Sequence, residues 1–213
     1  MSASVEGGAG RTDHALERLI FFSDAVFAIA ITLLVVEIRV PHLPKDSPDV
    51  AYWAQLAGLF PSLMGWLISF AVIGLFWMGH HRAFAMTARY HGRILAWNMA
   101  LLGTMAFMPF VTAFMAQNLN QRVPTLIYCG TLLLAALLNI VVVRIATSPP
   151  MVDPAADPPT IHYARGRGMA VALGASTALV AAFFFPVYAQ IGLATIGLWR
   201  RLLTKRPAAS PLA

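Results

Sequence analysis

Charged residues are scarce in this chain. Only 11% of its 213 residues are Asp, Glu, Lys or Arg, whereas 59% are hydrophobic and the mean hydropathy is +0.70. A soluble domain carries roughly 25% charged residues, so this sequence lacks the polar surface that a water-soluble fold needs. Several apolar runs of about 20 residues predict instead an all-α integral membrane protein.

Cysteine is nearly absent as well. The single Cys129 lies in an apolar run, which excludes an intrachain disulfide and argues against a metal cluster, so no cofactor is expected. The net charge of +6 comes from Arg residues beside apolar runs, which indicates membrane topology rather than nucleic-acid binding. Cys129, Ser176 and the histidines form no nucleophile–base pair at one depth, so the sequence does not predict an enzyme.

Prolines and charges divide the apolar sequence into six predicted spans within a transmembrane domain at 17–204. The predicted spans cover residues 17–38, 52–81, 94–116, 123–146, 167–185 and 187–203. The second would reach about 45 Å against a hydrocarbon core of about 30 Å, so Pro61 either kinks it or starts it. Residues 1–16 are expected to be disordered, the proline-rich stretch 148–159 to be a loop, and 205–213 to be a tail.

Basic residues orient these spans. With both termini in the cytoplasm, twelve Lys and Arg residues fall on the inner side and three on the outer side. The three outer ones are Arg39, Lys45 and Arg122. The sequence therefore predicts a multi-pass protein with cytoplasmic termini, and its Arg-, Ala- and Pro-rich composition points to the plasma membrane of a prokaryote.

Polar residues recur at one depth near the inner ends of the first three spans. Asp24 follows Arg18 by six residues, which places it about 9 Å into the first helix. The polar residues at this depth are Ser23, Asp24, His80, His81 and Asn98. Because charge inside a membrane costs several kcal/mol, such groups pair with one another, and we expect a hydrogen-bonded tether between the helices.

Two other roles compete with the tether. His80 and Asp24 are chemically suited to a proton relay. A metal site is disfavoured, because the adjacent His80 and His81 point about 100° apart on a helix.

The first span has one apolar face. Taking Ile29 as the origin at about 100° per residue, Phe22, Leu33 and Val36 fall within about 40° of it, Thr32 lies about 60° away, and Asp24 lies on the far side. An apolar face with one hydroxyl, opposite a polar anchor, is typical of a helix that lines a central axis.

Three motifs resemble the transmembrane protein 175 family of potassium channels. The first is Arg18-x-x-x-Phe22-Ser23-Asp24, followed by Ala28-Ile29 and Thr32-Leu33-Leu34. The second is Trp77-x-x-His80-His81-Arg82-x-Phe84, and the third is the pair Asn98 and Pro109 in the third span.

The resemblance implies a homotetramer in which four first helices surround a pore. Only one copy of the first motif is present, as in bacterial members; animal members carry two. It implies a constriction of apolar side chains at Ile29, Leu33 and Val36, with Thr32 contributing to potassium preference. Val36 is shorter than the side chain expected there, so the outer ring would be wider. The motif residues Arg18, Phe22, Ser23, Asp24, Trp77, His80, His81 and Asn98 would be structural.

The leading hypothesis is therefore a potassium-preferring cation channel in the lipid bilayer, with potassium as the permeant ion and no nucleic-acid partner. The sequence has no TVGYG-like filter, so conduction would depend on wetting of a hydrophobic constriction. The alternative is a proton-coupled or proton-conducting transporter that uses Asp24 and His80. Transporters of that class usually bind at mid-membrane between repeats, whereas this polar cluster lies near one end.

Overall fold

The protein is all-α in the computed structural model, which describes residues 3–204 and the side chains from residue 14 onward. Its elements, in chain order, are α1 (Ala3–Val36), α2 (Asp49–Gly58), α3 (Phe60–Ala85), α4 (Gly92–Gln117), α5 (Arg122–Ala146), α6 (Pro158–Phe184), the 3-10 turn η1 (Pro186–Tyr188) and α7 (Ala189–Leu203). The predicted tail at 205–213 lies outside the described residues.

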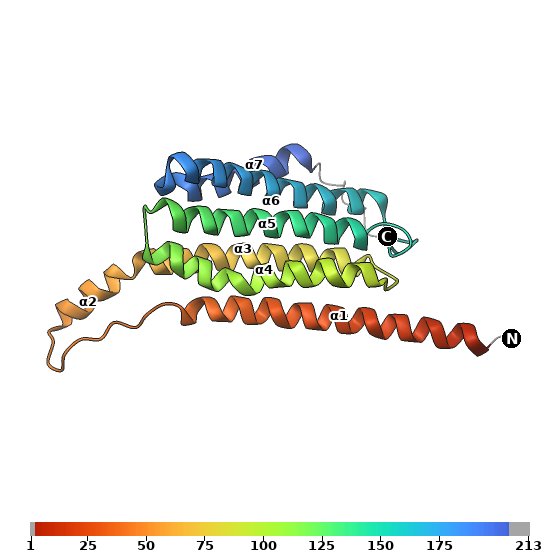
Figure 1. Cartoon of the computed structure of the whole chain (residues 1–213), viewed down its shortest axis with the longest axis horizontal. Coiled ribbons are helices and arrows are strands. Elements are labelled where there is room, and N and C mark those ends of the chain that lie inside the picture. The colour runs from red at the N-terminus through yellow and green to blue at the C-terminus, as the bar shows by residue number, and fades with distance from the viewer. Residues whose placement is uncertain (1–2, 205–213) are drawn as a thin grey trace, which may run out of the picture.

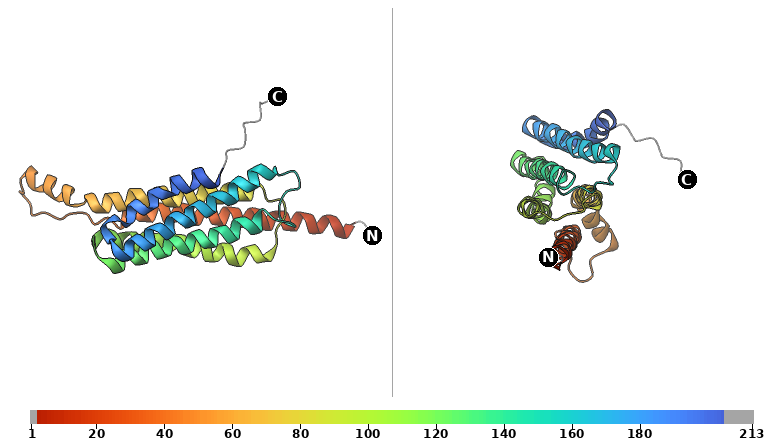
Figure 2. Two further views of the ribbon diagram at one scale, coloured as in Figure 1. Left: turned by 90° about the horizontal axis from the view of Figure 1, so that it is seen from above. Right: turned by 90° about the vertical axis from the view of Figure 1, so that its right-hand side faces the viewer.

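The long helices alternate in direction and form one bundle (Figure 1). α1 packs against α3 and α4, α4 against α5, α5 against α6, and α6 against α7. The end-on view in Figure 2 shows α1 at one edge of the bundle and the α6–α7 pair at the opposite edge. α2 extends past the end of the bundle and leaves all of its residues at least partly exposed. α1 is thus the only long helix at its edge of the described bundle.

Five helices, rather than the six that the sequence predicted, are long and apolar enough to cross a membrane by length and composition. They are α1 from His14 onward, α3, α4, α5 and α6. The predicted sixth span, 187–203, is a 3-10 turn followed by the 15-residue α7. Such a helix rises about 22 Å, short of a hydrocarbon core of about 30 Å.

Close backbone contact fixes α7 against α6. A Cβ built on Gly192 would lie 2.6 Å from the Cα of Ala178, so only glycine allows the two helices to approach this closely. Ala175, Ala178 and Ala182 are fully buried along the same line of α6. Small residues at this spacing let membrane helices pack backbone to backbone.

The second predicted span divides at Leu59. α2 ends at Gly58 and α3 begins at Phe60, with Pro61 in its first turn. Proline has no N–H to donate and its ring clashes with the preceding turn, but both features are harmless at a helix start. Pro61 therefore starts the span rather than kinking it.

Two other boundaries differ from those predicted. α6 begins at Pro158, inside the predicted loop 148–159, because Asp157 caps it: its Oδ2 accepts from the backbone N of Thr160 at 3.1 Å and from its hydroxyl at 2.8 Å. α1 begins at Ala3, whereas residues 1–16 were expected to be disordered. Extending an existing helix does not require the costly formation of a new first turn. The helix therefore continues through the glycines of that segment.

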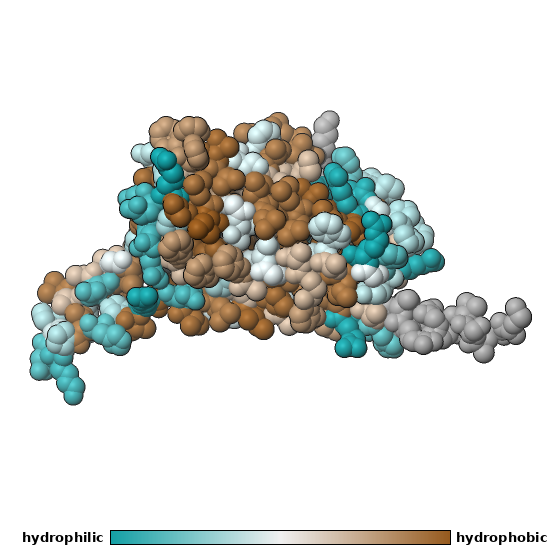
Figure 3. Space-filling model, viewed as in Figure 1, coloured by the Kyte–Doolittle hydropathy of each residue, from teal (hydrophilic) through white to brown (hydrophobic). Residues whose placement is uncertain are grey.

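On the face of the molecule that Figure 3 shows, an apolar band covers the middle of the bundle, and polar residues gather toward both ends. The alternating helix directions bring Arg82, Arg93, Arg144, Arg165 and Arg201 to one end, and Arg39 and Arg122 to the other. This distribution agrees with the predicted positive-inside pattern.

Cysteine labelling tests the predicted orientation. In intact cells, a membrane-impermeant thiol reagent should label Lys45→Cys, and should label Arg89→Cys only after permeabilisation, because the basic end faces the cytoplasm. The native Cys129 is 1% exposed and serves as an unlabelled control. The reverse pattern would contradict the predicted orientation.

Candidate functional site

One stripe of α1 is buried against α3 and α4. Leu19, Ser23, Phe27, Ala30 and Leu34 are each at most 5% exposed and recur every three or four residues. This spacing places them on a single helix face. The stripe fixes the rotation of α1 about its own axis within the subunit.

A second face of α1, about 120° around the helix from the buried stripe, is apolar and exposed. Ile29 is 56% exposed, Leu33 43%, Val36 72% and Phe22 48%. The four residues that the wheel groups around Ile29 are all exposed, as are Phe21 at 72% and Val35 at 53%. An exposed face on a long apolar helix, at the edge of the bundle, is available to lipid or to another subunit.

Thr32 lies within this exposed face. Its hydroxyl donates to the backbone carbonyl of Ile29 at 2.9 Å, rather than to Ala28, which a back-bonding threonine also commonly uses. The donated proton is directed along the helix, which leaves both lone pairs of the hydroxyl oxygen free to accept. The back-bond and the coordination of a cation are therefore compatible.

A buried chain of hydrogen bonds joins α3, α4 and α1. Asn98 Oδ1 lies 2.8 Å from His80 Nε2, and Asn98 Nδ2 donates to Ser23 Oγ at 2.8 Å. Ser23 in turn donates to the carbonyl of Leu19 at 2.7 Å. All three side chains are at most 1% exposed. The predicted contact between Ser23, His80 and Asn98 is present.

The donor and acceptor atoms of these side chains determine the direction of each hydrogen bond in the chain. Asn98 Oδ1 can only accept, so His80 carries its proton on Nε2. Within the described residues, His80 Nδ1 is buried without a hydrogen-bond partner, and the ring lies between Phe84, with centroids 4.3 Å apart, and Phe27, at 5.5 Å. The chain ends on the backbone carbonyl of Leu19, so among the described residues it joins three helices and leads to no further side chain.

Asp24 and His81 lie outside this chain, contrary to the prediction of one five-residue cluster. Asp24 is partly buried, and its Oδ1 accepts from Trp77 Nε1 at 2.8 Å, while His81 is exposed beside the Trp77 ring. The reason is geometric: consecutive residues on a helix point about 100° apart. The residues around 23 and 80 therefore form two separate contacts, and Arg18 is exposed.

Within the described residues, no group of three or more His, Cys, Asp or Glu side chains could hold a metal ion.

A second buried polar cluster was not predicted. Thr112 of α4 donates to Ser69 of α3 at 2.8 Å, and Ser69 lies 3.1 Å from the hydroxyl of Tyr128 on α5. All three are at most 4% exposed. Each of these residues is a single polar residue within an apolar run. Such residues are common in membrane helices, so the sequence alone does not indicate which helices they connect.

Residues 18–109 match the family model described as endosomal/lysosomal potassium channel TMEM175. A potassium channel of Chamaesiphon minutus is 43% identical over 123 residues, which are 56% of this chain and 60% of that protein. The human endosomal/lysosomal proton channel TMEM175 is 35% identical over 96 residues, which are 42% of this chain and 18% of the human protein. The match thus spans less than two thirds of either curated relative.

The fold is also similar to a solved structure. The crystal structure of a Chamaesiphon minutus homologue of the lysosomal potassium-selective channel TMEM175 matches with a TM-score of 0.74 and 31% identity, over 91% of this chain and 100% of that one. The matched family segment runs from Arg18 in α1 through α2 and α3 to Pro109 in α4. It therefore includes both the exposed α1 face and the buried Ser23–Asn98–His80 chain.

Proposed function

This chain belongs to the transmembrane protein 175 family, and on that premise we propose that it is a cation channel that prefers potassium. It is a multi-pass membrane protein of a family of ion channels, not of enzymes. The observation that carries the proposal is the exposed apolar face of α1, which is rotated away from the subunit's own core.

Four copies of that face around one axis would form the pore of a homotetramer. Ile29, Leu33 and Val36 would narrow it, with Ile29 as the tightest ring. The support is their position: all three are exposed on one side of a helix whose other side is fixed by buried packing. A pore lined by such side chains conducts when water and ions enter the constriction, so its gate is hydrophobic.

Thr32 would supply the potassium preference. Four hydroxyl oxygens would face an ion that has lost part of its hydration shell, and without a charged ring they favour the ion that dehydrates at lower cost, which is potassium. The geometry that supports this role is the proton donated to Ile29, which leaves the oxygen free to accept a cation.

Proton conduction through Asp24 and His80 is the second candidate, and the name of the human relative favours it. The hydrogen bonds of Asp24 and His80 argue against proton conduction through them. Asp24 bonds to Trp77, His80 bonds to Asn98, and an amide such as Asn98 has no titratable proton to pass on. Any proton flux would then follow the wetted pore.

A reconstitution assay tests the proposed function. The purified protein, placed in liposomes, should carry potassium faster than sodium under matched gradients, with valinomycin vesicles and empty vesicles as references. Flux of protons without potassium would support the alternative, and no flux of any of the three ions would refute both.

Substitution of Thr32 tests its role in selectivity. Thr32→Val keeps the shape and removes the hydroxyl, so the potassium-to-sodium permeability ratio should fall toward one. Thr32→Ser keeps the hydroxyl and should retain the ratio. Reversal potentials under bi-ionic conditions measure both. An unchanged ratio in Thr32→Val would assign Thr32 to helix packing.

A further inference from the structure

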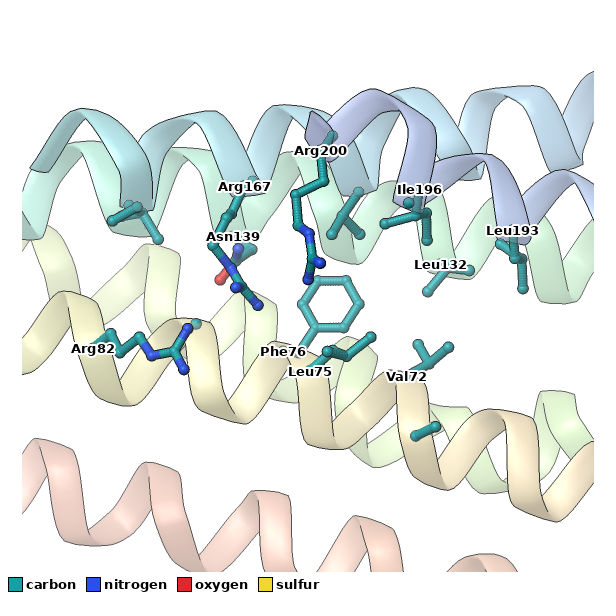
Figure 4. A pocket seen from close by; sticks show the side chains of 18 of the residues that line it. Val72, Leu75, Phe76, Arg82, Leu132, Asn139, Arg167, Leu193, Ile196 and Arg200 are labelled. Atoms are coloured by element: carbon teal, nitrogen blue, oxygen red, sulfur yellow. The ribbon is translucent and has the colours of Figure 1, made fainter. Parts of the chain in front are cut away.

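A cavity of about 720 Å³ lies between α3, α5, α6 and α7, away from the exposed face of α1. Most of its lining is apolar and includes Val72, Leu75, Phe76, Leu132 and Leu193 (Figure 4). It follows α7 from Gln190 to Arg200, which is about 15 Å of helix. That length matches half of a hydrocarbon core of about 30 Å, the depth of one leaflet.

Three arginines from three helices enter this cavity. Arg82 of α3, Arg167 of α6 and Arg200 of α7 line it and point into the same space in Figure 4. No acidic side chain of the described residues lines the cavity, and the only salt bridge among those residues joins His14 to Glu17 elsewhere. The cavity therefore gathers positive charge without a counter-charge from the described protein.

The cavity also contains buried acceptors that lack donors. Asn139 is 6% exposed, and its Oδ1 has no hydrogen-bond partner within the described residues. Gln190 Oε1, near the other end of the cavity, also has no hydrogen-bond partner within the described residues. Figure 4 places Asn139 beside Arg167. A ligand that satisfies these acceptors brings hydrogen-bond donors, such as hydroxyl groups, as well as negative charge.

We propose that this cavity binds one anionic phospholipid whose head group carries hydroxyls. The phosphate is held by Arg82, Arg167 and Arg200, since guanidinium groups bind phosphate through paired N–H donors. A head-group hydroxyl donates to Asn139, and an acyl chain occupies the apolar part. The arginines lie at the basic end of the bundle, so the lipid belongs to the predicted cytoplasmic leaflet, where basic pockets between helices recognise anionic lipids.

Native mass spectrometry of the purified protein tests this site, with phosphatidylglycerol, phosphatidylcholine or inorganic phosphate added in turn. The wild type should retain phosphatidylglycerol at least tenfold better than phosphatidylcholine. The variant with Arg82, Arg167 and Arg200 all changed to Gln should lose that preference. Gly197→Phe should lower retention too, because a Cβ at Gly197 meets open space and a ring there would fill the cavity.

A matched variant with Arg89, Arg93 and Arg144 changed to Gln removes the same charge from the same end, outside the cavity, and should bind like the wild type. Equal losses in both triple variants would overturn the site in favour of general surface charge. Retention of phosphate without lipid would overturn it in favour of a free anion. If the Arg82, Arg167 and Arg200 variant retains the lipid but assembles with a different number of subunits from the wild type, the cavity would instead be a subunit interface. None of these readouts depends on ion conduction.

Discussion

Ile29→Asn is expected to raise the basal potassium flux about tenfold, since each ~1.4 kcal/mol removed from a barrier speeds passage about tenfold. Four amide side chains would hydrogen-bond water within the proposed tightest ring, where four isoleucines exclude it. The position tolerates the change, because Ile29 is 56% exposed and makes no part of the subunit core. Potassium flux from liposomes at matched protein content measures the effect.

Ile127→Asn is the matched control for this change. It makes the same replacement on α5, where Ile127 is 39% exposed and the helix is separated from α1 by α4. It should leave the flux unchanged. An increase in Ile127→Asn with none in Ile29→Asn would place the ion pathway away from α1.

Asn98→Ala is expected to cause the largest loss of stability. The substitution leaves His80 Nε2 and Ser23 Oγ buried without their shared partner, and an unmade hydrogen bond in such surroundings costs about 1–3 kcal/mol. Because Asn98 connects three helices, the proposed tetramer should dissociate at a lower temperature. Fluorescence-detected size-exclusion chromatography after heating measures the remaining assembly.

Asn118→Ala provides the comparison, at the residue that directly follows the same helix. Asn118 makes one local bond, to the carbonyl of Phe114 at 2.9 Å, and joins no second helix. It should reduce stability much less. If Asn98→Ala instead assembles as well as Asn118→Ala and loses only proton movement, the polar chain is a relay and not a tether.

The effect of an Asp24 substitution on stability should depend on whether the new side chain can still accept a hydrogen bond. Trp77 is a neutral donor that needs one acceptor oxygen, and both a carboxylate and an amide supply it. Asp24→Asn therefore preserves the contact with Trp77, and Asp24→Leu removes it.

The exposed face of α1 was predictable because a helix has a fixed period. Ile29, Leu33 and Val36 share that face whatever packs on the other side. The depth of Ser23, His80 and Asn98 followed from counting residues from charged helix ends. Their direct contacts in the structure bear this out.

Rotation of neighbouring helices was not predictable in this way. Residue depth alone placed Asp24 and His81 with His80, but the direction of a side chain about the helix axis depends on which partner helix lies there. The Ser69–Thr112–Tyr128 cluster was missed for the same reason. The sixth predicted span, 187–203, has nearly the bounds of η1 and α7, but α7 is not long and apolar enough to count as a membrane crossing.

The most direct test of the central claim is chemical block of cysteines placed along α1, in a Cys129→Ser background. Potassium current through Ile29→Cys and Leu33→Cys channels should be blocked by silver ions, because both positions face the proposed pore. Ala30→Cys and Leu34→Cys should be insensitive, since these neighbours are 1% and 2% exposed against their own subunit. Block of a cysteine at Leu75, in the cavity beside α3, with none at Ile29 and Leu33, would contradict a pore lined by α1.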